Sequence, residues 1–108
     1  MATFEEFKKI ELKTGKVLEA ERVEGSEKLL KLKVDLGEPE SRQILAGIGK
    51  VYAPEELIGR EIVVVANLEP RMLMGMESRG MLLAGHGENG EPVLLKPDRE
   101  IPPGSAVS

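Results

Sequence analysis

The chain has 108 residues, of which 41% are hydrophobic and 31% charged, and its formal net charge is -4. This length and composition are typical of one folded domain, residues 1–108, and exclude a disordered tail. The chain has no cysteine and one histidine, His86, which excludes disulfides, thiolate zinc sites, a cysteine nucleophile and an all-imidazole metal site. No apolar run approaches the roughly 20 residues that span a bilayer. The charged start "MATFEEFKKI" lacks the apolar region of a signal peptide, so we predict a cytoplasmic protein without membrane contact.

The first element predicted is a short helix. Thr3 followed by Glu6 forms a capping-box pattern, and Phe4 and Phe7 lie three residues apart on one helix face. This apolar face could close one end of a barrel or pack on a second subunit. The sequence leaves both alternatives open.

Three predicted strands follow. The first covers residues 10–24, where Gly15 indicates a bulge or bend. The second covers residues 29–36, where apolar and polar residues alternate as in a half-buried strand. The third is "RQILAGI", residues 42–48.

The second half begins with a short predicted helix between Ala53 and Gly59, because Pro54 suits the first helical position. Further predicted elements are a fourth strand at 60–68, a fifth at 80–87, a turn at 88–90, a short strand at 91–97 and an extended tail at 101–108. Three strands, a helix and two strands are the order of a five-stranded OB-fold barrel. We therefore predict an all-β OB fold with N- and C-terminal additions.

OB barrels bind ligands on the face of strands 2 and 3 and through the loops after strands 1 and 4. Here those loops are Glu24–Lys28 and Leu68–Arg79. The chain has only three aromatic residues, and two lie in the first predicted helix, so a platform for stacking bases is not expected. Folded RNA, recognised through its backbone and shape, fits better. The polar candidates on this face are Lys28, Lys31, Lys33, Arg42, Arg71, Ser78 and Arg79.

Several strings in order along the chain carry a family resemblance. They are "GKVLEAE", "KVDLGE", "RQILAGI", "VVVANLEPRMLMGMESRGMLL" and the terminal "PPGS". Together they resemble the tRNA-binding domain found at the C-terminus of methionyl-tRNA synthetases, as a free-standing protein, and in a synthetase-associated factor. The family fold is an OB barrel, in agreement with the predicted strand order.

The resemblance implies binding to the outer corner of folded tRNA without regard to the anticodon. It also implies a homodimer that serves a methionyl-tRNA synthetase catalytic chain or domain. Asn67 matches the family motif in the second loop and joins the predicted tRNA-binding residues. Glu69 and Met72 stand where the family commonly has lysines, and the first loop lacks the family's His-Pro, so weaker backbone contacts are expected.

The leading hypothesis is thus a non-catalytic tRNA-binding and dimerisation module without metal or cofactor. The alternative is a peptide-binding, chaperone-like homodimer, since methionine-rich loops suit adaptable apolar contacts. An enzyme ranks third, because no spacing marks a metal site or an acid–base pair. Among the methionines, we expect Met81 to face the core, whereas Met72, Met74 and Met76 fall in the second ligand loop.

Overall fold

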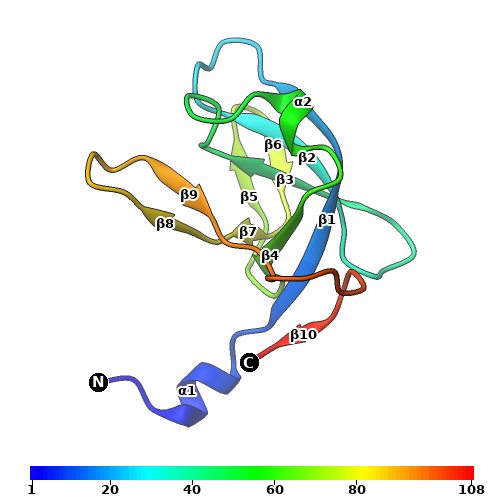
Figure 1. Cartoon of the computed structure of the whole chain (residues 1–108), viewed down its shortest axis with the longest axis vertical. Coiled ribbons are helices and arrows are strands. Elements are labelled where there is room, and N and C mark those ends of the chain that lie inside the picture. The colour runs from blue at the N-terminus through cyan, green and yellow to red at the C-terminus, as the bar shows by residue number, and fades with distance from the viewer.

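The computed structural model describes all residues, 1–108, and is built mainly from strands (Figure 1). In chain order the elements are α1 (Phe4–Lys8), β1 (Leu12–Arg22), β2 (Leu30–Asp35), β3 (Arg42–Ala46), α2 (Pro54–Leu57), β4 (Glu61–Val65), β5 (Arg71–Leu73), β6 (Met76–Ser78), β7 (Met81–Leu82), β8 (Ala84–His86), β9 (Pro92–Leu94) and β10 (Ala106–Val107). Neither helix has the length and apolar character needed to cross a membrane.

Five antiparallel strands form the barrel in the order β3-β2-β1-β4-β7. The barrel nearly closes where β3 meets the end of β6. There the Arg79 N–H donates to the Gln43 carbonyl at 2.9 Å, and the Leu45 N–H donates to the Ser78 hydroxyl oxygen at 3.0 Å. The predicted all-β OB barrel, with a short helix between its third and fourth strands, is confirmed.

Apolar and polar residues alternate along the strands, and the apolar set forms the barrel core. In β2 the leucines and Val34 are fully buried while the intervening Lys31, Lys33 and Asp35 point outward, as period-two patterning requires. The core cluster comprises Val17, Leu30, Leu32, Val34, Leu36, Ile44, Ala46, Ile48, Leu57, Ile62, Val64 and Ala66. The outward side chains of β2 and β3 therefore do not contribute to the core and can contact a ligand.

The segment expected to be the second ligand loop contains a hairpin. β5 and β6 pair through a two-residue turn in which Met74 has φ 49° and Gly75 has φ 78°. Two consecutive positive φ values are the requirement of a type I′ turn, which favours Asn-Gly. Methionine at the first position costs of order 1 kcal/mol. The sequence did not reveal this turn, because Met-Gly is not one of its usual pairs.

The predicted fifth strand divides in two. β7 pairs with β4 and completes the barrel, whereas β8 leaves it and pairs with β9 as a projecting hairpin (Figure 1). The short strand predicted after the turn at 88–90 is β9. The C-terminal tail returns to the barrel, where β10 pairs with the start of β1. Buried Thr14 fixes this return, because its backbone and hydroxyl exchange hydrogen bonds with residues 102–105.

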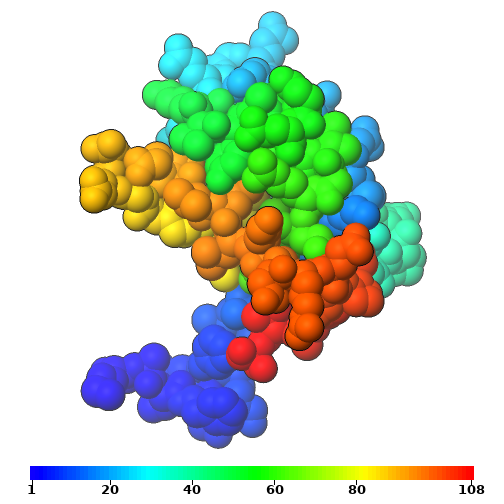
Figure 2. All heavy atoms as spheres, in the orientation of Figure 1, coloured from blue at the N-terminus to red at the C-terminus, as the bar shows by residue number.

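Helix α1 has the predicted capping box: the Thr3 hydroxyl accepts from the Glu6 N–H, and the Glu6 side chain accepts from the Thr3 N–H. None of its residues is buried, and Phe4 is 71% exposed. The helix projects from the barrel, and an open space separates it from the β8–β9 hairpin (Figure 2). The alternative in which α1 closes a barrel end is therefore wrong.

Gly15 does not mark a bulge. The register between β1 and β2 shifts two residues later, between Val17 and Glu19. A Cβ atom on Gly15 would lie 2.8 Å from Val34 Cγ1 and 2.9 Å from Leu36 Cδ2, so close packing across the barrel requires glycine here. The bulge prediction was wrong because the constraint on Gly15 comes from residues distant in sequence.

We therefore expect Gly15→Ala to lower the free energy of unfolding by about 1–3 kcal/mol through overpacking. Gly85→Ala in β8 is the matched control, because its nearest neighbour would be the Val93 carbonyl oxygen at 4.0 Å. Urea unfolding followed by circular dichroism measures both variants. Equal stability of the two variants would contradict this account of Gly15.

Candidate nucleic-acid interface

The candidate interface is the outer face of β2 and β3. In an antiparallel pair, directly opposite residues share one face. Lys31 lies opposite Leu45 and Lys33 opposite Gln43, so these four side chains point away from the core cluster, although Leu45 is covered and only 6% exposed. The β5–β6 hairpin borders the same face, since the Gln43 side-chain amide donates to the Glu77 carbonyl at 2.9 Å. Both predicted ligand loops therefore adjoin this face.

A hollow of about 490 Å³ lies between the two loops on this face. The first loop, β3, the hairpin and β7 all contribute to its wall, which is mainly apolar. The two charged residues in the wall, Lys28 and Arg71, are both basic, although the chain as a whole is acidic. This arrangement concentrates positive charge beside an apolar cavity.

The backbone of the first loop holds Lys28 in place. The Lys28 carbonyl accepts from the Gly49 N–H at 2.7 Å, and the Ser26 hydroxyl oxygen accepts from the Leu29 N–H at 3.1 Å. The Lys28 side chain remains exposed. A fixed backbone with a free ammonium group suits contact with a phosphate.

Lys31 and Lys33 point outward as predicted, but they face acidic residues of β1. Lys31 Nζ lies 2.6 Å from Glu21 Oε1, and Lys33 lies opposite Glu19 in the strand register. The hydrogen bond from Lys31 lowers the pKa of the Glu21 carboxyl, so this pair stays ionised in mildly acidic solution. Part of the positive charge of the strand face is therefore neutralised within the protein.

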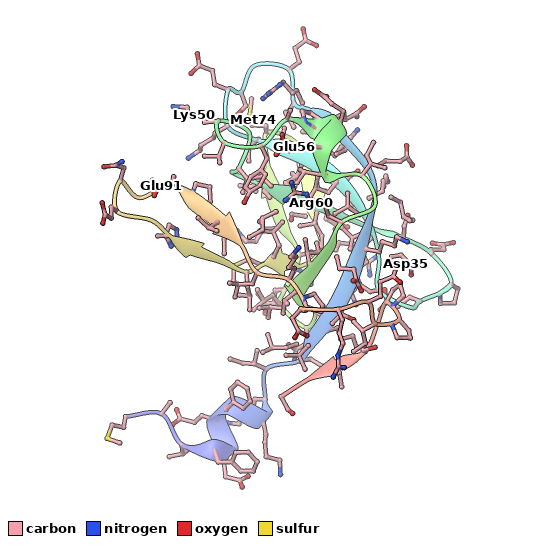
Figure 3. The ribbon with its side chains drawn as sticks, viewed as in Figure 1. Asp35, Lys50, Glu56, Arg60, Met74 and Glu91 are labelled. Atoms are coloured by element: carbon pink, nitrogen blue, oxygen red, sulfur yellow. The ribbon has the colours of Figure 1, made fainter.

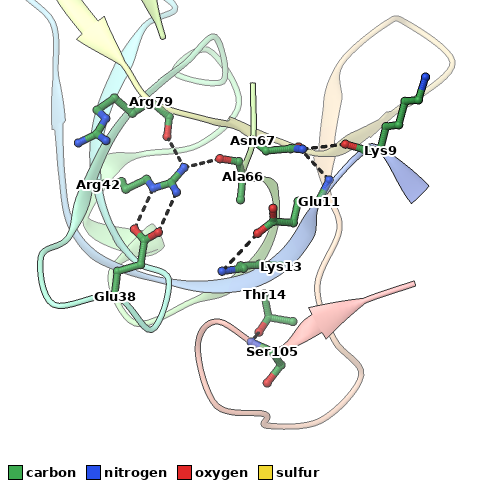
Figure 4. A network of polar contacts seen from close by, with 10 residues as sticks. All are labelled: Lys9, Glu11, Lys13, Thr14, Glu38, Arg42, Ala66, Asn67, Arg79 and Ser105. Carbon is green, nitrogen blue, oxygen red and sulfur yellow. Dashed lines mark hydrogen bonds and ion pairs between the residues drawn. The ribbon is translucent and has the colours of Figure 1, made fainter. Parts of the chain in front are cut away.

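Arg42 makes contacts inside the domain with most of its guanidinium donors (Figure 4). Its Nε and Nη2 donate to the two carboxylate oxygens of Glu38 at 2.9 and 2.8 Å. Its Nη1 donates to the carbonyl oxygens of Ala66 and Arg79. The Arg42 side chain is only 17% exposed. Arg42 thus joins the β2–β3 loop, the end of β4 and the segment before β7.

Ser78 and Asn67 also have internal partners. Ser78 is 5% exposed, and its hydroxyl both accepts from the Leu45 N–H and donates to the Gly80 carbonyl. Asn67 Oδ1 accepts from the Glu11 N–H at 2.8 Å, and its Nδ2 donates to the Lys9 carbonyl at 2.7 Å (Figure 4). Ser78 helps to close the barrel, and Asn67 fixes the segment that carries α1.

Arg71 and Arg79 remain exposed on the hairpin and just after it. Arg79 makes one long ion pair, 3.9 Å from Nε to Glu77 Oε1, with both side chains more than half exposed. The freest of the eight predicted side chains are therefore those of Lys28, Lys33, Arg71 and Arg79. Contact of all eight with tRNA stays a prediction.

The methionines differ from expectation at one position. Met81 is 44% exposed and lines the hollow, so its predicted core position is wrong; the neighbouring Leu82 packs against the core instead. Leu45 also belongs to this face and was not predicted there. Its signal was available, because Leu45 lies between two inward residues of one strand and must point outward.

The family model of the tRNA binding domain matches residues 12–106, nearly the whole chain. The chain belongs to the family of tRNA-binding domains. A methionine–tRNA ligase of Methanothrix thermoacetophila is 61% identical over 104 residues, which are 96% of this chain but 15% of that protein. The tRNA-binding domain described here thus spans about a sixth of the length of the curated relatives that it matches.

Solved structures agree with this assignment. A MetRS related protein from Pyrococcus horikoshii superposes with a TM-score of 0.93 at 39% identity, covering 100% of this chain and 98% of that chain. The chaperone CsaA from Bacillus anthracis superposes with a TM-score of 0.90 at 40% identity, covering 100% and 99%. The same tRNA-binding domain fold therefore occurs both in a protein described as MetRS related and in one described as a chaperone.

The Glu38–Arg42 pair of the tRNA-binding domain gives a pH-dependent test. The hydrogen bond from Arg42 lowers the pKa of the Glu38 carboxyl from its ordinary value of 4.5. A lowered pKa in the folded state means that this contribution to stability is complete above pH 4.5 and is lost as the pH falls through the lowered pKa. We expect Glu38→Gln to lower the free energy of unfolding by about 1 kcal/mol at pH 7. In acid, the free energy of unfolding of this variant should fall less steeply than that of the wild type.

Glu56→Gln is the matched control, because Glu56 and Arg60 are also four residues apart but lie 3.7 Å apart and are both 45% exposed. Urea unfolding at pH 7 and at a series of acidic pH values compares the two variants. If the free energies of unfolding of both variants follow the same pH profile, the role given to the Glu38–Arg42 pair is wrong.

Proposed function

We propose that this domain binds folded tRNA without catalysis and without regard to sequence. The observation that carries the proposal is the pair of basic side chains, Lys28 and Arg71, beside the hollow on the ligand face of a tRNA-binding domain. Lys33 and Arg79 extend this basic surface along the strand and the hairpin. Side chains of this kind contact phosphates and 2′-hydroxyls, which every tRNA presents at its outer corner.

Three of the predicted residues contribute to binding by positioning other parts of the chain: Arg42, Asn67 and Ser78. Arg42 and Ser78 hold the hairpin and the following segment against β3, so that Arg71 and Arg79 face the same ligand. Lys31 contributes less charge because Glu21 pairs with it. The binding surface therefore rests on Lys28, Lys33, Arg71 and Arg79 and on a scaffold of polar residues.

A homodimer is the second part of the proposal. Phe4, Phe7 and Ile10 are exposed on and beside α1, and Val93 and Leu95 are exposed on and beside the β8–β9 hairpin. Figures 1 and 2 show α1 and this hairpin projecting on the same side of the barrel with open space between them. Apolar side chains gathered in this way favour a second copy as their partner.

The relatives named methionine–tRNA ligase support a role beside a methionyl-tRNA synthetase catalytic chain or domain in the cytoplasm. In that role the domain would hold the corner of the tRNA while the catalytic part acts elsewhere on it. The similarity to the chaperone CsaA favours a second candidate, a homodimer that binds unfolded peptide in the same hollow. Binding assays with tRNA and with peptide separate the two.

Salt-dependent binding tests the tRNA function. Anisotropy titrations with two unrelated folded tRNAs should give equal affinities that fall steeply as salt rises from about 50 to about 200 mM. Arg71→Gln should reduce the slope of log affinity against log salt by about 1. Met72→Lys, which adds a charge at an exposed position of β5, should tighten binding modestly.

Lys96→Gln is the control with the same loss of charge, because Lys96 is exposed on a different surface, beside the C-terminal segment. It should leave both affinity and slope unchanged. Absence of tRNA binding at about 50 mM salt would refute the proposed function. Binding of an unfolded polypeptide in that case would favour the second candidate.

The dimer is tested by the double substitution Phe4→Ser with Phe7→Ser. We expect it to convert the dimer to a folded monomer, because neither side chain contributes to the barrel core. Light scattering coupled to gel filtration gives the mass, and circular dichroism confirms folding. Ile58→Ser, at an exposed apolar residue next to α2, is the control and should leave the dimer intact. A wild-type mass equal to one chain would contradict the proposal.

A further inference from the structure

We infer that the apolar hollow beside Lys28 and Arg71 is a pocket for one unstacked nucleobase of the bound RNA. This inference rests on the proposed tRNA-binding function and adds to it a site that contacts a base, in addition to the contacts with phosphates and with the shape of the RNA. The pocket wall includes Leu29, Leu45, Leu73, Met74, Met81 and Leu82. Its volume, about 490 Å³, lies within the range of small-ligand pockets, roughly 300–1,000 Å³.

The charge of the rim favours a nucleotide over other occupants. Lys28 and Arg71 flank the cavity, and its wall holds no acidic residue. A base that enters the cavity brings its own phosphates to the rim, where these two cations can contact them. An apolar peptide side chain would fill the cavity equally well, but it carries no charge for Lys28 and Arg71 to pair with.

Met74 supplies the second observation. It is the one non-glycine residue with a positive φ, and its side chain is 54% exposed although apolar. Its Cε atom lies 3.3 Å from the position that a Cβ on Gly25 would take, so the thioether reaches from the hairpin to the first loop. Figure 3 places Met74 at the end of the barrel far from α1. A strained backbone that holds an exposed thioether over a cavity indicates a ligand contact.

The chemistry of the wall fits this ligand. No aromatic side chain lines the cavity, so stacking on an aromatic platform is replaced by contact between the base faces and aliphatic or thioether groups. Flipped-out bases are held between apolar side chains in other proteins, and methionine sulfur packs favourably against ring systems. Single-stranded loops of folded RNA provide unstacked bases of this kind.

The test is nuclear magnetic resonance of the intact chain with ¹³C-labelled methionine methyl groups. Of the five methionines, Met74 and Met81 line the pocket. On addition of folded tRNA we expect ring-current shifts to lower frequency at these two methyls and only small changes at Met1, Met72 and Met76. Salt-dependent tRNA binding without those shifts would refute the base pocket and leave the proposed function standing.

Two further outcomes separate the occupants. Failure of tRNA to bind would refute the proposed function and the base pocket together. If an unfolded apolar peptide shifts the Met74 and Met81 methyls and tRNA does not, the pocket belongs to a peptide. Both results are read from the same labelled sample.

Two variants address affinity. Gly47→Leu fills the cavity edge, where an added Cβ would meet only Lys28 Cδ at 3.8 Å; Gly85→Leu is the control. We expect Gly47→Leu to lower tRNA affinity about fivefold or more, because its side chain fills space that a base would occupy. Met74→Asn should weaken binding while the protein becomes no less stable, since asparagine suits a positive φ. Unchanged affinity in both variants would overturn the inference.

Discussion

One guanidinium group, that of Arg42, joins three segments of the chain whose relative positions shape the ligand face. Arg42 holds Glu38 in the β2–β3 loop, the Ala66 carbonyl at the end of β4 and the Arg79 carbonyl before β7. Strands β4 and β7 pair over only two residues, so a planar group with several donors can fix three segments that this short ladder leaves free. Lysine could not do this, because its single ammonium group lacks the fork geometry that pairs with a carboxylate.

The Ala66–Asn67 corner connects the contacts of Arg42 to the N-terminal segment. Arg42 holds the corner from one side, and Asn67 holds the segment before β1 from the other (Figure 4). The ligand face and the base of α1 are therefore connected through two consecutive residues. Binding of RNA on one side and packing of α1 on the other would stabilise the same corner, so the two proposed roles share a structural element without sharing a surface.

The sequence predicted most of the barrel because alternation in strands such as "LLKLKVDL" assigns each side chain to one face. It did not predict the β5–β6 hairpin, since nothing in Met74-Gly75 resembles the usual residues of a type I′ turn, and the strain is visible only in the backbone. Nor could it separate Arg71, which is free, from Arg42, which is bound within the fold. Residue type shows what a side chain can contact, and only three-dimensional neighbours show what it does contact. Met81 illustrates the same limit: strand alternation fails where a strand is two residues long and borders a cavity.

The ligand face also explains how an acidic chain can bind an anion. Glu21 and Glu19 oppose the two strand lysines, Glu69 and Met72 add no positive charge to the second loop, and the remaining free cations are few. Phosphate contacts lose strength with salt because each one releases counterions, whereas burial of a base in an apolar pocket does not depend on ionic strength in this way. A domain with fewer cations and an apolar pocket would keep more of its affinity at high salt than one that binds through cations alone. Met74 then has a physical reason to occupy a turn position where asparagine would be more stable, because only an apolar, flexible side chain both spans the two loops and packs against a ring.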